Sequence, residues 1–171
     1  IAEGVETTTH GLMLMLIGCD HAQGYGIARP MPAAEFKTWF NNYQANQDWL
    51  DFAYLNLSAR QKLLTLLTIE SKQWLSRMIA SLESPTEEIQ PWPAINHDQS
   101  LYALWLGQAR NQQLFDPDWI ERLEQAFNQL HQLGKDAKEQ FLQGQIEQAQ
   151  AAITNIQQTY AIIDELLEYA D

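Results

Sequence analysis

The sequence predicts a mainly α-helical protein, in which a short βαβα segment precedes a C-terminal four-helix bundle. Two observations predict this class. Five of the eight glycines lie within the first forty residues, and such a density indicates strand ends and tight loops. After residue 46, apolar residues recur at intervals of three and four, which is the spacing of one helix face. The chain therefore divides into two parts, residues 1–46 and residues 47–171.

Four elements are predicted in the first part. The pattern indicates a strand end at Ile1–Val5, a helix at Thr7–Ile17 and a short strand at Ala22–Ile27. A second helix is expected from Pro32 to Tyr43, because proline fits the first turn of a helix. Strands and helices that alternate in this way are typical of βαβα units.

Two helices open the predicted bundle. A long helix is expected at Ser58–Leu82, with Ser58 as its N-cap, and it stops before the Ser84-Pro85 pair. A proline-rich connection then leads to a shorter helix at Asp98–Gln112. Helices with one apolar stripe each bury that stripe best in a bundle.

The last two helices are predicted to form an antiparallel hairpin. The Asp116-Pro117 pair is typical of a helix start, and the chain turns near Gly144. The final helix has a heptad seam, which needs a partner helix. The seam residues are Ile146, Ala149, Ile153, Ile156, Tyr160, Ile163, Leu167 and Ala170.

Composition excludes several classes of function. The chain has 22 acidic and 10 basic residues and a formal charge of -12, so it lacks the clustered cations that hold nucleic-acid phosphates. The longest apolar run, Leu12 to Ile17, is too short to span a bilayer, and no membrane contact is expected. The single cysteine, Cys19, is consistent with a reducing compartment, which predicts a cytoplasmic location.

Residues 1–45 contain a motif series in one order. The stretch AEGVET is followed by GCDHAQGYGIARPMPAAEF. This series resembles the closing part of an EAL domain, the family of cyclic-di-GMP phosphodiesterases built on a TIM-like barrel. The resemblance implies that the chain is cut from a longer bacterial protein, whose EAL domain uses Mg²⁺ or Mn²⁺ to hydrolyse cyclic-di-GMP.

The resemblance also implies roles for three residues. Glu3 and Glu6 would lie at the carboxyl end of a barrel strand and act in catalysis in an intact barrel, and Gln23 would reach the bound dinucleotide. The Glu-Ala-Leu signature, the other metal-binding carboxylates and the catalytic lysine of the family are absent here. We therefore expect no hydrolysis and no cofactor for this chain alone, in which Glu3 and Glu6 would be solvated acids.

The second part resembles the chemoreceptor zinc-binding family. The stretches that carry the resemblance are ESKQWL, NHDQSLYALWLG and LEQAFNQLHQLGKDA. The family holds zinc with three histidines and one cysteine. Here those positions fall on Ser71, on Tyr102 or Leu104, on Phe127 and on His131. One histidine cannot hold a structural zinc, so we expect no metal.

Three functions compete at this point. The first is a sensory or dimerisation bundle attached to an EAL phosphodiesterase, which predicts a homodimer through the helices. The second is an adaptor whose acidic surface binds another signalling protein, and the third is an independent enzyme, which the missing barrel disfavours. Trp92, Tyr102, Trp105 and Trp119 would line a small-molecule pocket or, as we expect for large aromatics in a bundle, fill its core.

Overall fold

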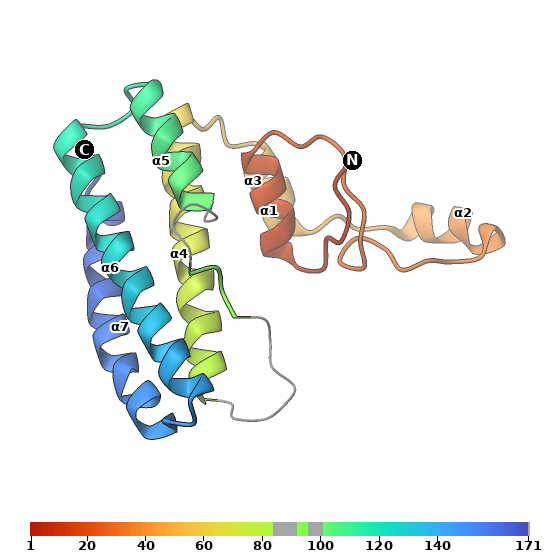
Figure 1. The fold of residues 1–171 in the computed structure, drawn as a ribbon. Helices are drawn as coiled ribbons and strands as arrows, with labels where there is room; N and C mark the ends of the chain where they lie inside the picture. The colour runs from red at the N-terminus through yellow and green to blue at the C-terminus, as the bar shows by residue number, and fades with distance from the viewer. Residues whose placement is uncertain (84–91, 96–100, 171) are drawn as a thin grey trace. The chain divides into compact units, whose positions relative to one another are not determined.

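The computed structural model describes residues 1–83, 92–95 and 101–170, and these residues form helices and loops (Figure 1). They divide into two compact units, Ile1–Lys62 and Leu63–Asp171. The helices are α1 (Thr8–Leu16), α2 (Ala33–Asn42), α3 (Gln47–Ala53), α4 (Ala59–Glu83), α5 (Leu101–Asn111), α6 (Pro117–Leu142) and α7 (Ile146–Glu168). The mainly α-helical class is thus confirmed for the described residues. The boundary predicted after residue 46 separates the two family resemblances. The structure does not test it, so it stays a prediction.

The first unit is organised around α1 and α3, which lie side by side (Figure 1). The Thr7 side chain caps α1 by accepting a hydrogen bond from the His10 amide at 3.2 Å. The Trp49 indole of α3 donates to the Thr8 carbonyl of α1 at 2.8 Å, and the Asn46 amide donates to the Thr8 hydroxyl at 2.9 Å. These two hydrogen bonds tie the start of α1 to the start of α3.

The two predicted strands do not form, so the βαβα expectation is wrong. In their place the described residues have one isolated parallel bridge, between Ala2 and Ala22. The physical reason is Gly4, whose φ of 75° takes the backbone out of the extended region after three residues. The pairing nevertheless has the parallel sense, through Ala2 N to His21 O (2.9 Å), Gln23 N to Ala2 O (2.8 Å) and Val5 N to Gln23 O (3.1 Å).

Side-chain caps begin the long helices at the expected positions. Ser58 and Gln61 form a reciprocal capping box ahead of α4, with distances of 3.2 Å and 2.9 Å. The Asp116 carboxylate accepts from the amides of Asp118 and Trp119, and Pro117 occupies the first turn of α6. The start of α5 predicted at Asp98 lies outside the described residues.

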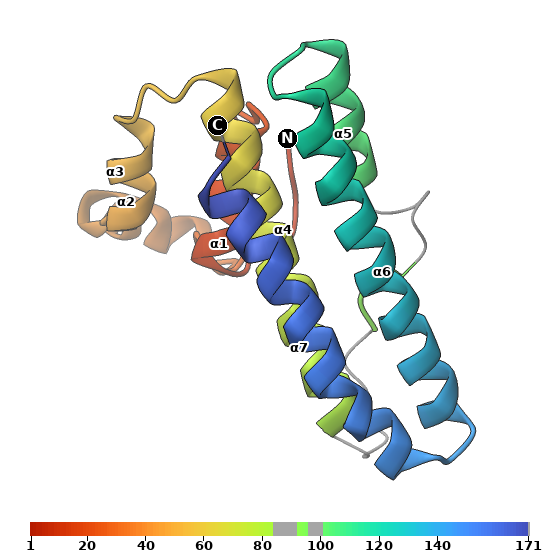
Figure 2. The same ribbon diagram turned by 90° about the vertical axis from the view of Figure 1, so that its left-hand side faces the viewer.

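The second unit is built on the α6–α7 hairpin, whose helices run antiparallel and turn at Gly144 (Figures 1 and 2). The heptad seam of α7 packs on α6 of the same chain. Its fully buried members include Ala149, Ile156 and Ile163. The partner helix that the seam requires is therefore supplied within the chain.

Helix α4 packs against this hairpin at Gly134 of α6. A Cβ at Gly134 would lie 2.8 Å from the Met78 methyl and from the Trp74 ring, so only glycine leaves room for these side chains. The Trp74 indole also donates to the Ala94 carbonyl at 2.7 Å. Trp74 therefore joins α4, α6 and residues 92–95.

None of the described helices combines the length and the hydropathy needed to cross a membrane.

Candidate functional site

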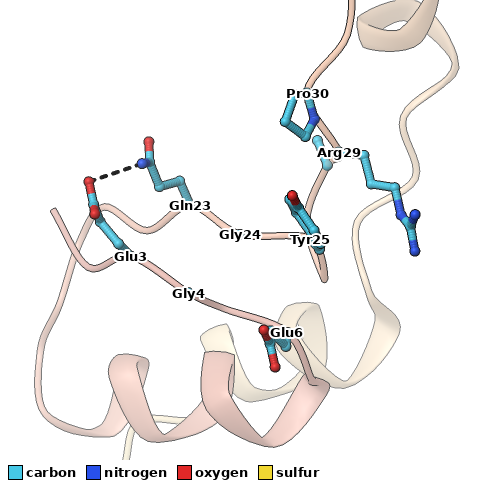
Figure 3. A pocket seen from close by; sticks show the side chains of 9 residues that line it. Glu3, Gly4, Glu6, Gln23, Gly24, Tyr25, Arg29 and Pro30 are labelled. Atoms are coloured by element: carbon cyan, nitrogen blue, oxygen red, sulfur yellow. Dashed lines mark hydrogen bonds between the residues drawn. The ribbon is translucent and has the colours of Figure 1, made fainter.

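The residues of the EAL-like motif line one open pocket of the first unit (Figure 3). Its volume is about 610 Å³. Three of its side chains are the residues singled out from the sequence, Glu3, Glu6 and Gln23. The pocket also includes Tyr25 and Arg29, which sequence reasoning did not select.

The pairing of two chain segments places Glu3 beside Gln23. The Gln23 side-chain Nε2 donates to Glu3 Oε1 at 3.1 Å, and both residues are exposed. Glu6 lies apart from this pair, on the other side of Gly4 (Figure 3). The structure thus brings together two of the three predicted residues and places the third in the same pocket.

Gly24 allows the backbone around Val5 and the backbone around Gln23 to approach closely. A Cβ on Gly24 would lie 2.2 Å from both the backbone nitrogen and the carbonyl oxygen of Val5. Val5 is buried, and its carbonyl accepts a hydrogen bond from the Gly26 amide at 2.8 Å. The backbone that carries Glu3 is therefore held directly against the Gln23-Gly24 stretch.

Arg29 adds a positive charge to this acidic pocket. Its guanidinium carbon lies 5.5 Å from the centre of the Tyr25 ring, a cation–π distance. A guanidinium binds carboxylates and phosphates with two hydrogen bonds, and Arg29 lies in a pocket that also holds the carboxylates of Glu3 and Glu6. Tyr25 and Arg29 belong to the QGYGIARP stretch, so the motif itself was the signal that pointed to them.

The described residues do not make a complete divalent-cation site. Among them, no three side chains of the His, Cys, Asp and Glu types converge. Mg²⁺ and Mn²⁺ prefer oxygen ligands and near-octahedral coordination, so Glu3 and Glu6 fit such an ion only as part of a larger ligand set.

The positions aligned with zinc ligands come from three helices and lie in the bundle interior. Tyr102 of α5 stacks on Phe127 of α6 at 4.4 Å and meets the His131 ring edge-on at 4.9 Å. Tyr102 is 2% exposed and Leu104 is 69% exposed, so the interior position of α5 is Tyr102. The His131 ring also stacks on Trp74 at 5.3 Å.

Ser71, the fourth of these positions, is buried on α4 and joins a polar cluster. Its hydroxyl donates to the Thr68 carbonyl at 3.1 Å and lies beside the Tyr160 hydroxyl of α7. Burial raises the pKa of Tyr160, and the nearby Ser71 side chain opposes that rise. Burial likewise raises the pKa of Glu70, against the opposing charge of Arg77.

Three of the four aromatic candidates lie in the core, and the fourth, Trp92, is half-buried. Tyr102, Trp105 and Trp119 are buried, and Trp119 stacks on Phe115 at 4.5 Å while donating to the Leu166 carbonyl at 2.9 Å. Trp92 packs on Phe141 at 5.5 Å. These contacts fit the expectation of core packing.

Both resemblances depend on short stretches of the chain. Comparisons with protein-family models, with curated proteins and with solved structures found no match.

Proposed function

We propose that residues 1–46 close the barrel of an EAL-type cyclic-di-GMP phosphodiesterase and that the helical unit is its C-terminal regulatory module, sensory or dimerising. Hydrolysis then belongs to the longer protein and not to this chain. The observation that carries the proposal is the hydrogen bond of 3.1 Å between Gln23 and Glu3. It joins two residues that the motif implicates independently, across two segments that meet in one parallel bridge.

The chemistry of this pair fits hydrolysis of a phosphodiester through a divalent cation, because a carboxylate without a cation repels the phosphate anion. A carboxylate accepts hydrogen bonds, and the Gln23 donor occupies Glu3 Oε1, which fixes the carboxylate and leaves Oε2 for another partner. Arg29 supplies the cation that a phosphate requires. In the complete barrel, Mg²⁺ or Mn²⁺ would activate a water molecule, with Glu3 and Glu6 as contributors to a larger set of carboxylates.

A graft tests this proposal. Residues 1–46 would replace the corresponding closing segment of an active EAL phosphodiesterase, and cyclic-di-GMP hydrolysis would be measured with Mg²⁺ and with Mn²⁺. We expect activity in the graft and a loss of about 100-fold or more in kcat with Glu3→Gln, because a group that acts at the reacting centre is removed. Gln23→Ala is expected mainly to raise KM. Glu35→Gln, an exposed change on α2, is the matched control and should leave both constants unchanged.

Two outcomes would contradict the proposal. One is a graft that folds but is inactive, although the recipient enzyme is active with its own closing segment. The other is equal activity in the Glu3→Gln and Glu35→Gln grafts, which would make Glu3 a solvated acid. The isolated chain is expected to show no hydrolysis, and its turnover would refute the assignment of catalysis to the longer protein.

The bundle is proposed to be a metal-free relative of the chemoreceptor zinc-binding family. Three of the four aligned positions, Tyr102, Phe127 and His131, have rings in direct contact although they come from two helices. Replacement of a ligand by Phe127 or Tyr102 substitutes core packing for a metal bond, which retains the stability of a closed site without zinc.

Restoring the ligands tests that relationship. The triple variant S71H/Y102C/F127H would provide three histidines with His131 and one cysteine, and we expect it to bind stoichiometric zinc and to gain thermal stability from it. The same variant with His131→Ala is the control and should lose most of the affinity. A folded triple variant that does not bind zinc would contradict the relationship to the chemoreceptor zinc-binding family. It would not affect the proposal about cyclic-di-GMP.

A further inference from the structure

A polar pocket of the second unit lies between α4 and α7. Its volume is about 360 Å³, and it is lined by Thr68 and Lys72 of α4 and by Asp164, Leu167 and Glu168 of α7. Both helices belong to the same compact unit from Leu63 onwards. Small-molecule sites in proteins have volumes of about 300–1,000 Å³, so the pocket has room for a small ligand.

The two helices give this pocket walls of opposite chemistry. Thr68 and Lys72 are four residues apart on α4, and Asp164 and Glu168 are four residues apart on α7, so each pair shares one helix face. The α4 wall can donate hydrogen bonds from a hydroxyl and an ammonium group, whereas the two carboxylates of the α7 wall accept them. Leu167 is buried and adds an apolar contact.

The opposite charges of the two walls are not paired with each other. Within the described residues, Lys72 forms no ion pair with Asp164 or Glu168. The hydrogen bond that Asp164 accepts comes from the Tyr160 hydroxyl of its own helix, at 3.5 Å. The pocket therefore keeps a cationic side and an anionic side apart across its volume.

The position of the two carboxylates favours a cation brought from outside the chain. Like charges four residues apart on a helix repel each other. Helix α7 ends at Glu168 and has no basic residue in its last turn, so the negative end of the helix dipole adds to this repulsion. An ammonium group of a ligand would relieve both.

The charges of both walls narrow the class of ligand. A simple anion is repelled by Asp164 and Glu168, and a simple cation is repelled by Lys72. A divalent metal ion also lacks ligands, because no three metal-binding side chains converge in the described part of the chain. A molecule with an ammonium group at one end and a carboxylate at the other matches both walls.

We propose that this pocket binds a free amino acid. The ammonium group of the ligand lies against Asp164 and Glu168, and its carboxylate accepts hydrogen bonds from Lys72 and Thr68. Lys72 and Glu168 are exposed, so solvent and salt weaken their attraction, and we expect a dissociation constant between about 10 µM and 1 mM. This inference goes beyond the proposed function, since it needs neither cyclic-di-GMP hydrolysis nor the relationship to a zinc-binding family.

Thermal unfolding of the full chain tests the proposal. Each standard L-amino acid is added separately at about 10 mM, well above the expected dissociation constant, and a ligand that binds the folded state raises the Tm. We expect at least one of them to raise it, and calorimetric titration with that amino acid to show saturable binding of one molecule per chain. Acetate and methylamine, each of which matches one wall alone, should leave the Tm unchanged.

Substitutions with matched controls locate the site. Lys72→Gln and Glu168→Gln should each raise the dissociation constant at least about ten-fold, because each removes a charged hydrogen-bonding partner of the ligand. The controls Lys135→Gln and Glu165→Gln change exposed residues outside the pocket and should leave the constant within about two-fold. Circular dichroism checks that every variant keeps its helices.

Three outcomes would overturn the amino-acid site. The first is a chain whose Tm no L-amino acid raises. The second is binding that both Lys72→Gln and Glu168→Gln leave unchanged, and the third is binding that the two control variants weaken as much. None of these measurements depends on the graft, so failure of this inference and failure of the proposed function are distinguishable.

Discussion

Replacement of Trp74 by alanine is expected to lower the free energy of unfolding of the helical unit by about 3–5 kcal/mol. The side chain is buried, stacks on His131 and fills the space that Gly134 leaves open. Its loss also leaves the Ala94 carbonyl without the indole donor at 2.7 Å. The neighbours come from two other segments, α6 and residues 92–95, so the cavity does not close by moving one side chain.

Urea denaturation followed by circular dichroism measures this effect. Trp39→Ala is the matched control, because Trp39 lies on α2, which buries none of its residues. That variant should stay within about 0.5 kcal/mol of the wild type. A loss below about 1 kcal/mol for Trp74→Ala would show that α4 does not depend on this contact.

Replacement of Gly24 by alanine is expected to separate Glu3 from Gln23. The new Cβ would meet the Val5 backbone at 2.2 Å, and no rotation of a side chain relieves a clash with backbone atoms. Such overpacking costs about 1–3 kcal/mol. The four backbone hydrogen bonds between the segments contribute about 1 kcal/mol each. The clash therefore offsets much of the free energy that pairs the segments, and the pairing should open more often.

Amide hydrogen exchange at Val5 and Gln23 reports this unpairing, because both amides donate across the two segments. We expect their protection to fall about ten-fold or more. Gly107→Ala is the control, since a Cβ there meets open space on helix α5 and should stabilise the chain by up to about 1 kcal/mol. Unchanged protection in Gly24→Ala would refute the role given to this glycine.

Local signals in the sequence located the long helices well, whereas the short α3 was not predicted. Ser58, Asp116, Pro117 and Gly144 lie at helix starts or at the hairpin turn, because caps and turns are set by a few neighbouring residues. The prediction of two strands was wrong for a related reason. Gly4 adopts a positive φ, which a pattern of apolar residues does not reveal. A short segment forms a ladder only when neighbouring segments extend it.

Contacts between residues that lie far apart in the chain could not be predicted from the sequence. The heptad seam of α7 was visible, but its periodicity is the same whether the partner is α6 or a second chain. The zinc alignment left Tyr102 and Leu104 open, and the packing of α5 placed Tyr102 inside. In the candidate site, the motif pointed to Glu3 and Gln23. Their hydrogen bond, however, depends on the path of residues 4–22, which brings the two side chains together.

The hairpin of α6 and α7 also has a kinetic consequence. Its two helices are consecutive and joined by a short turn at Gly144, so their contacts close with little loss of chain entropy. By contrast, the contacts of Trp74 and Met78 with Gly134 close a loop of more than fifty residues. Local contacts form faster than distant ones. The hairpin should therefore fold first and offer a preformed surface on which α4 docks later.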